Sequence, residues 1–151
     1  MAEMIEILAR EMVVDLETAP DTFTKIEAVE SITVNPGKVD ADTGHFDAAG
    51  WARHIVAERS LELTLNIVYQ EDEDTGDRPP GQQALQDLAN EIGYQSLGTF
   101  RIYGPNGKGI KFKASASVPP IAGGGRNDAG TYSATITMSG KPEPVTVAPT
   151  P

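Results

Sequence analysis

Residues 61–70, which read LELTLNIVYQ, decide the fold class because apolar and polar residues alternate through them. The odd positions are apolar or aromatic, from Leu61 to Tyr69, whereas most of the even positions are polar. A period of two is typical of a β-strand that is buried on one face and exposed on the other. The stretch therefore predicts a strand that packs one face against a hydrophobic core.

A hairpin follows further along the chain. Residues 110–118, IKFKASASV, alternate in the same way and end at Pro119-Pro120, since proline cannot donate to a strand ladder. Residues 99–103 point Phe100 and Ile102 to one face, and GPNGK at 104–108 is typical of a turn. The shared apolar faces predict a register in which Phe100 opposes Phe112, Ile102 opposes Ile110 and Arg101 opposes Lys111.

The remaining elements are a helix and further strands. Residues 82–92 place apolar side chains three and four positions apart, between Pro79-Pro80-Gly81 and Gly93, which predicts the one helix. We expect strands over residues 11–17 and 131–138 and a bent strand or strand pair over residues 23–34. Residues 35–58 and 119–129 are expected to be long loops, and the Pro-rich residues 141–151 an extended arm. The chain is thus expected to be mainly β, with one domain over residues 1–140 and the arm after it.

Composition narrows the possible functions. The chain has 151 residues, no cysteine and a net charge of −10. The missing thiols exclude disulfides, thiolate metal sites and a cysteine nucleophile. Negative charge is the wrong sign for gripping nucleic acid, but it suits a conduit through which a polyanion slides. No apolar run is long enough for a membrane span, and the acidic start, MAEMIE, is unlike a secretory signal.

No chemical motif points to catalysis. The acidic run at 71–77 lacks the spacing of an EF-hand, so we expect a solvated loop rather than a metal site. Residues 104–109 lack the spacing of a phosphate loop. His45 and His54 have no partners at catalytic or zinc-binding spacing, and hydrolase motifs are absent. The expectation is a protein that is not an enzyme and needs no cofactor or metal.

Basic residues gather on the polar face of the hairpin. Arg101, Lys111 and Lys113 lie side by side in the predicted register, and like charges at such positions destabilise a sheet. One interpretation is plain solvent exposure. The other is that the acidic run of a neighbouring subunit lies against this basic strip.

The order of these elements resembles the tail tube proteins of long-tailed bacteriophages. The resemblance covers about residues 12–140. It is carried by Gly50-Trp51 before the strand at 61–69, by the hairpin from Phe100 to Phe112, and by the Thr-rich strand that runs into Ser139-Gly140.

This resemblance implies a sandwich or barrel of two packed antiparallel sheets with one flanking helix. It also implies hexameric rings that stack into a hollow tube conducting genomic DNA, with residues 35–58 and 141–151 bridging the rings. The implied partners are further copies of this chain and the tail terminator, tail tip and tape-measure proteins, in a virion tail assembled in the bacterial cytoplasm. The candidate contact residues are Phe46, Asp47, Trp51, His54, Asp72, Asp74, Arg101, Lys111 and Lys113.

Two alternatives stay open at this point. Phe46 and Trp51 could be anchors that bury against a neighbouring subunit, or they could fold back on their own core. The chain as a whole could instead be a β-sandwich binding module that recognises a surface carbohydrate or protein, although its few tyrosines are scattered over separate elements.

Overall fold

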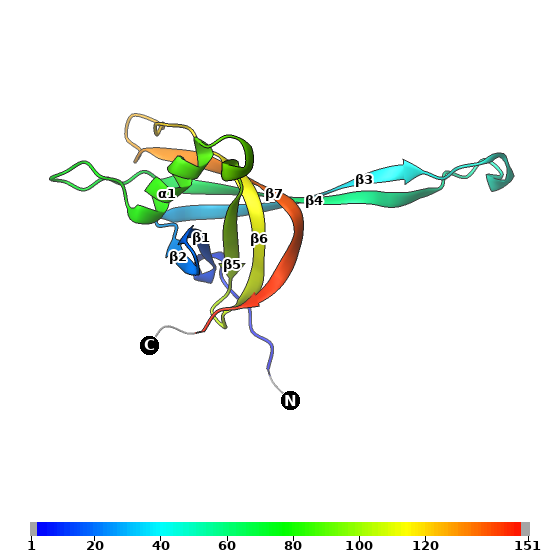
Figure 1. The fold of residues 1–151 in the computed structure, drawn as a ribbon, viewed down its shortest axis with the longest axis horizontal. Helices are drawn as coiled ribbons and strands as arrows, with labels where there is room; N and C mark the ends of the chain where they lie inside the picture. Colours follow the sequence, from blue (N-terminus) through cyan, green and yellow to red (C-terminus); the bar gives the residue numbers. More distant parts are fainter. Residues whose placement is uncertain (1–2, 149–151) are drawn as a thin grey trace.

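The computed structural model describes residues 3–148, and Figure 1 shows a strand-rich body from which one long hairpin projects. The chain is mainly β with a single α-helix, as the alternation predicts. The elements are η1 (Ala9–Glu11), β1 (Val13–Ala19), β2 (Thr22–Lys25), β3 (Val29–Asp42), η2 (Phe46–Ala48), β4 (His54–Val68), α1 (Pro80–Ala89), η3 (Gly93–Ser96), β5 (Gly98–Tyr103), β6 (Lys108–Ser117) and β7 (Thr131–Thr146).

The strands form one antiparallel sheet rather than the two packed sheets that the resemblance implies. The seven strands lie in the order β2-β1-β5-β6-β7-β4-β3. The strands form one sheet because β7 is long enough to pair on both sides. It pairs with β4 over Thr131–Thr137 and with β6 over Thr135–Thr146. Because β7 takes part in both halves, and because the register shifts between Lys111 and Lys113, the sheet curls around its core without breaking.

The core lies inside this curl and is closed by α1, which packs against β1, β2 and β6. The apolar positions predicted from the alternation are confirmed as buried in the middle of β4, β5, β6 and β7. Those nearer the ends of the stretches are half-buried: Leu61, Tyr69, Ile110, Ala116, Val118 and Met138. The rings of Phe100 and Phe112 stack with their centroids 5.9 Å apart. The buried apolar residues are Val14, Leu16, Ile26, Leu63, Leu65, Ile67, Leu85, Phe100, Ile102, Phe112, Ala114, Tyr132, Ala134 and Ile136.

The hairpin of β5 and β6 has the predicted register. Phe100 pairs with Phe112, Ile102 with Ile110 and Arg101 with Lys111. The turn contains Gly107 at a φ of 81°, where an L side chain would be strained.

Helix α1 is shorter than predicted. It begins at Pro80, and it ends before Asn90 because the chain turns away there, leaving Ile92 90% exposed instead of in the core. The start of α1 is fixed against the chain before β3, where the Glu27 carboxylate accepts a hydrogen bond from the Gly81 amide at 3.1 Å. A Cβ at Gly81 would collide with the carbonyl of Lys25, so the helix lies closer to β2 than any other residue would allow.

The predicted loop at residues 35–58 is wrong. Most of it is strand: β3 continues to Asp42 and β4 begins at His54, so that only residues 43–53 form a link. We call residues 35–61 the arm; Figure 1 shows it as the hairpin that projects to the right of the body. Both faces of the arm are exposed over most of its length, so burial imposes no alternation of apolar and polar residues there.

The C-terminal segment is extended, as expected, but it is not a free arm up to Thr146. Residues 141–146 continue β7, in which Glu143 pairs with Lys111 and Pro144 with Ile110. Proline is tolerated here because beyond Ser139 the other edge of β7 is open within the described residues. Residues 149–151, the end of the expected C-terminal extension, lie outside the described residues. None of the helices within residues 3–148 has the length and hydrophobicity of a membrane span.

Candidate assembly interfaces

The tip of the arm presents two aromatic side chains to solvent. Phe46 in η2 is fully exposed, and Trp51, after a turn formed by Ala49 and Gly50 at positive φ, is 80% exposed. Neither side chain packs on the core of its own chain. The alternative that these aromatics fold back on their own core is therefore excluded, and both are available to a partner.

The shaft of the arm exposes further apolar side chains that the sequence reading missed. Val34 just before it, together with Val39, Ile55 and Val56, is exposed although each lies in a long strand. Exposed apolar side chains along a projecting hairpin make this surface a candidate interface. A signal was present in the sequence, since β-branched residues recur at these positions, but the loop interpretation hid it.

Charged residues of the arm interact with one another. The Asp40 carboxylate forms an ion pair with Lys38 at 3.4 Å and lies 3.9 Å from the ring Nε2 of His54, all of them on the surface. The guanidinium of Arg53 lies 3.3 Å from the ring of His45. The candidate contact residues Asp47 and His54 are thus both on the exposed arm, next to Phe46 and Trp51.

The acidic loop at residues 71–77 lies far from the arm, on the opposite side of the body (Figure 1). The carboxylate of Asp72 accepts hydrogen bonds from the amides of Asp74 and Thr75 at 2.9 and 3.0 Å. These two amides hold the pKa of Asp72 below its usual value, because they stabilise the charged form. These hydrogen bonds to Asp72 order the turn of the loop, and Asp74 is exposed at its tip.

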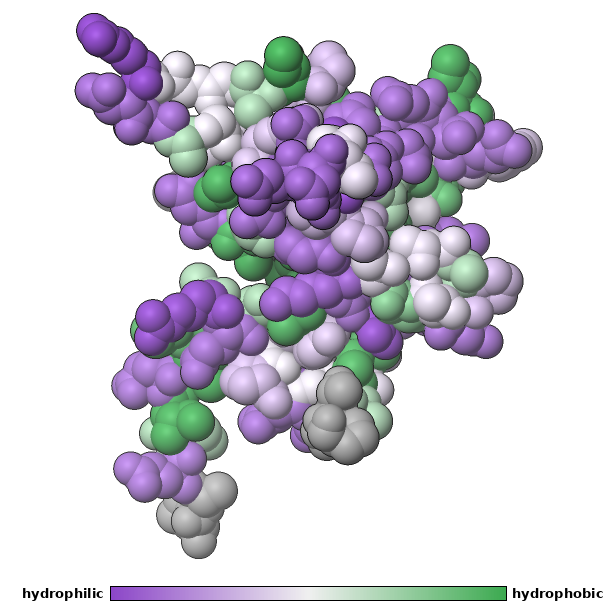
Figure 2. Space-filling view, turned by 90° about the vertical axis from the view of Figure 1, so that its left-hand side faces the viewer, coloured by the Kyte–Doolittle hydropathy of each residue, from purple (hydrophilic) through white to green (hydrophobic). Residues whose placement is uncertain are grey.

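The loop is anchored by Arg78, whose guanidinium lies 4.9 Å from the ring centre of Tyr69 and 5.3 Å from that of Tyr132. Figure 2 views the molecule with this loop toward the reader and shows hydrophilic residues over its centre. Among the described residues, no group of acidic or histidine side chains is arranged to hold a metal ion.

The basic strip is partly neutralised within its own chain. Arg101 donates a hydrogen bond to Asp15 of β1 at 2.8 Å and lies 4.0 Å above the ring centre of Phe23. Lys111 pairs in register with Glu143, and Lys113 with Ser139; both lysines are exposed. Hence Arg101 is an internal ion-pair partner, and Lys111 and Lys113 are the parts of the strip that remain accessible.

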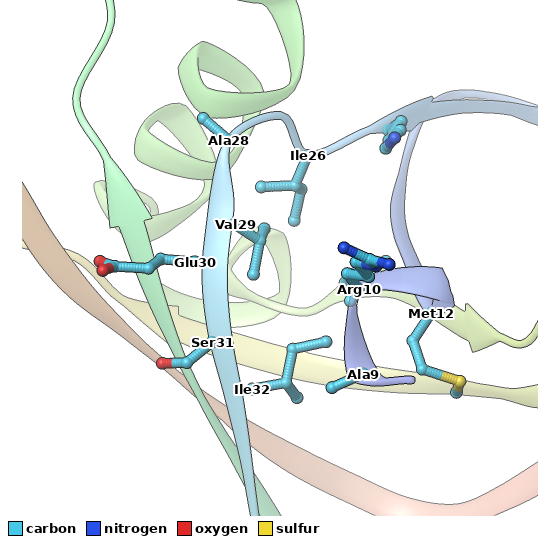
Figure 3. Close-up of a pocket in the computed structure, with 11 residues that line it drawn as sticks. Ala9, Arg10, Met12, Ile26, Ala28, Val29, Glu30, Ser31 and Ile32 are labelled. Carbon is cyan, nitrogen blue, oxygen red and sulfur yellow. The ribbon is translucent and has the colours of Figure 1, made fainter. Parts of the chain in front are cut away.

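A small cavity of about 170 Å³, lined by apolar residues and by Arg10 and Lys25, lies between η1 and the first residues of β3. Figure 3 shows Ile26, Val29 and Ile32 pointing into it, whereas Glu30 and Ser31 point away.

The structure thus brings Phe46, Asp47, Trp51 and His54 together on the arm, and Arg101, Lys111 and Lys113 on one sheet face. It places Asp72 and Asp74 on a separate loop. The sequence indicated each group separately, but it could not show the distance between them.

The fold is shared with chains in solved structures of gene transfer agent particles and of a contractile injection system. A chain in the virion of a native gene transfer agent particle matches with a TM-score of 0.65 at 14% identity, covering 91% of this chain and 98% of that one. A chain in the tail of an empty gene transfer agent particle with C6 symmetry has a TM-score of 0.61 at 17% identity, covering 93% and 98%. A chain in the sheath–tube complex of an extracellular contractile injection system has a TM-score of 0.57 at 14% identity, and the match covers 94% of this chain and 93% of that one.

These likenesses confirm the resemblance to phage-like tail tube proteins at the level of the fold. No protein-family model and no curated protein matches the sequence.

Proposed function

We propose that this protein is the structural, non-enzymatic subunit of a phage-like tail tube, in which hexameric rings stack into a hollow channel that conducts DNA. The observation that carries the proposal is the projecting arm with exposed Phe46 and Trp51, on a fold shared with tail subunits. A protein that worked alone would gain nothing from a hairpin whose apolar side chains face water.

Assembly would relieve two costs that the free subunit carries. The first is the exposed apolar surface of the arm, which a neighbouring copy would cover. The second is the pair of open sheet edges at β2 and β3, whose unpaired backbone groups invite pairing with another chain. Contacts that join one surface to a different surface close into rings by rotation and give filaments by stacking.

The convex side of the sheet supplies a surface suited to a channel wall. Where β6, β7, β4 and β3 lie side by side, the side chains facing away from the core are nearly all short hydroxyls and amides. We call this surface the hydroxyl face; its members are Ser115, Ser117, Ser133, Thr135, Thr137, Glu62, Thr64, Asn66, Ser31 and Thr33.

Part of the hydroxyl face is held by hydrogen bonds across the strands. Asn66 donates to Ser31 at 2.9 Å and accepts from Ser133 at 2.6 Å. The sole charged member is Glu62. In the proposed tube this face lines the channel, because a neutral or weakly acidic wall lets phosphate slide without binding it.

The same proposal covers partners and location. The tube consists of copies of this chain, capped by tail terminator and tail tip proteins and filled before ejection by a tape-measure protein, in a virion tail assembled in the bacterial cytoplasm. The exposed Lys111 and Lys113 would meet the acidic loop of a neighbouring subunit, which includes Asp74.

Sizing chromatography over a range of concentrations, with negative-stain microscopy of the same fractions, tests this proposal. The expected result is a shift from monomer to large species that appear as hollow tubes of uniform width. A protein that stays monomeric at millimolar concentration, even with a tail-tip initiator present, would favour the β-sandwich binding module instead.

A further inference from the structure

The base of the arm contains a fork between two strands. β4 pairs with β7 from Glu62 to Val68, but before Glu62 the two strands diverge, because β7 turns to follow β6. Within the described residues, the edge of β4 that faces β7 is therefore open from His54 to Leu61. An open edge of this length can accept one more extended segment.

A groove of about 670 Å³ fills this fork. Leu61, Met138 and Pro142 give it apolar walls, and the charged residues of its lining are Arg59, Lys141 and Glu58. None of the ion pairs within residues 3–148 involves Arg59 or Lys141. The groove thus combines apolar walls with a small excess of positive charge, two basic side chains against one acidic one.

The segment before η1 has the complementary character. Residues 3–8 read EMIEIL, with Met4 93% and Ile5 71% exposed and no regular secondary structure. Within the described part of the chain, no hydrogen bond joins residues 3–7 to the body. The segment runs away from the body in Figure 1, and Figure 2 shows green, hydrophobic atoms on the projection at the lower left.

We propose that residues 3–8 of one copy dock in the fork of a second copy, with Ile5 in the groove and Glu3 and Glu6 beside Arg59 and Lys141. The match is one of both hydrophobicity and charge. This interface goes beyond the proposed tube by naming which segment joins which groove, and it rests on that function only in requiring self-association.

The open edge of β4 is the better acceptor of the two strands in the fork. β7 carries Pro142 and Pro144 beyond the fork, and proline protects an edge against strand addition. β4 has no proline between His54 and Leu61. The docked segment therefore lies along β4, where backbone hydrogen bonds add to side-chain burial.

Cysteine cross-linking tests this interface directly, because the chain contains no cysteine of its own. Full-length Ile5→Cys protein is mixed with full-length Met138→Cys protein that carries a mass tag, and the mixture is oxidised at a concentration at which the parent protein associates. We expect a mixed covalent dimer on a non-reducing gel. The control mixture replaces Met138→Cys by Ile92→Cys, which is more accessible than the half-buried Met138 but lies just after the end of α1.

Comparing the mixture with a double variant shows whether the docked segment comes from the same chain or from a second copy. The Ile5→Cys/Met138→Cys double variant can cross-link within one chain, whereas the mixture can cross-link only between chains. A cross-link in the double variant's monomer without one in the mixture would overturn the proposal, as would equal yields from the test and control mixtures.

Charge exchange gives an independent test that does not depend on cysteine. Reversing Glu3 and Glu6 to Lys should weaken self-association at least tenfold, and reversing Arg59 and Lys141 to Glu in the same chain should restore it. All four side chains are exposed, so the monomer should keep its thermal stability. Loss without restoration would overturn the pairing.

The outcomes distinguish the interface from the tube. Hollow tubes without a cross-link in the mixture would refute the docking and leave the tube intact. Cross-linked pairs without tubes would support the docking and refute the tube. The absence of both would refute both.

Discussion

Replacing Trp51 by serine should impair assembly without affecting the folded monomer. Trp51 is 80% exposed at the tip of the arm, so its ring contributes little to the stability of its own chain. In the proposed tube the same ring is buried against a neighbour. The substitution therefore separates folding from assembly.

The size of the effect follows from the area at stake. Burying the exposed part of a tryptophan removes about 150–200 Å² from water, which is worth about 4–5 kcal/mol at about 25 cal/mol per Å². Ordering the side chain and the tip of the arm offsets about half of this gain. About 2 kcal/mol then remains per contact, and this raises the concentration needed for assembly about 30-fold.

The assay is sedimentation across a concentration series, beside thermal unfolding of dilute monomer. Tyr94→Ser is the matched control, since Tyr94 is 96% exposed but lies in η3 on the body. Trp51→Ser should shift the assembly threshold, whereas Tyr94→Ser should not. A fall of several degrees in the melting temperature of the Trp51→Ser monomer would show that the ring packs on its own chain, and an unchanged threshold would show that the arm tip is not an interface.

Three further outcomes are expected. Arg101→Met should lower the free energy of unfolding in urea by about 3 kcal/mol, because it leaves the Asp15 carboxylate, only 3% exposed, without its partner; the double variant with Asp15→Leu should recover most of that loss. Gly109→Ala should destabilise by about 1–3 kcal/mol, since its Cβ would collide with a carbonyl across the β5–β6 hairpin, and no loss would mean that the hairpin relaxes freely. The pKa of Asp72 is held below its usual value, so the order that its carboxylate gives the acidic loop is present above that value and is lost as the pH falls through the lowered pKa. NMR signals of the two amides bonded to it should move below about pH 4, and Asp72→Asn should abolish that movement.

The sequence predicted those parts of the fold in which one face is buried. Residues 61–70 and 110–118 show alternation because the core selects apolar side chains at every second position. In the β5–β6 hairpin a short turn leaves few possible registers, and matching the apolar faces of Phe100 and Phe112 selects the observed one.

The sequence could not predict the arm or the way the sheet is joined. Residues 54–60 are strand with both faces exposed, and no burial pattern marks such a strand. Alternation also shows which face of a strand is buried but not which strands are neighbours, so β7 bridging both halves of the sheet was hidden. For the same reason the ion pair of Asp15 could not be predicted. The sequence places Asp15 on the polar face of β1, but Arg101 becomes its neighbour only because β1 pairs with β5.

For the candidate interfaces, the residue types indicated possible contacts, but the sequence did not show where the side chains lie in the fold. Phe46 and Trp51 stand out among small and polar residues, and the structure places both in solvent. Arg101 was grouped with Lys111 and Lys113 as an external surface, yet it faces a carboxylate of its own chain.

Electron microscopy of the assembled protein with helical averaging tests the central claim most directly. We expect six subunits around an open channel, with the hydroxyl face turned inward and each arm crossing to the next ring. Solid filaments, rings with the hydroxyl face outward, or a protein that remains a monomer at every concentration would contradict the account.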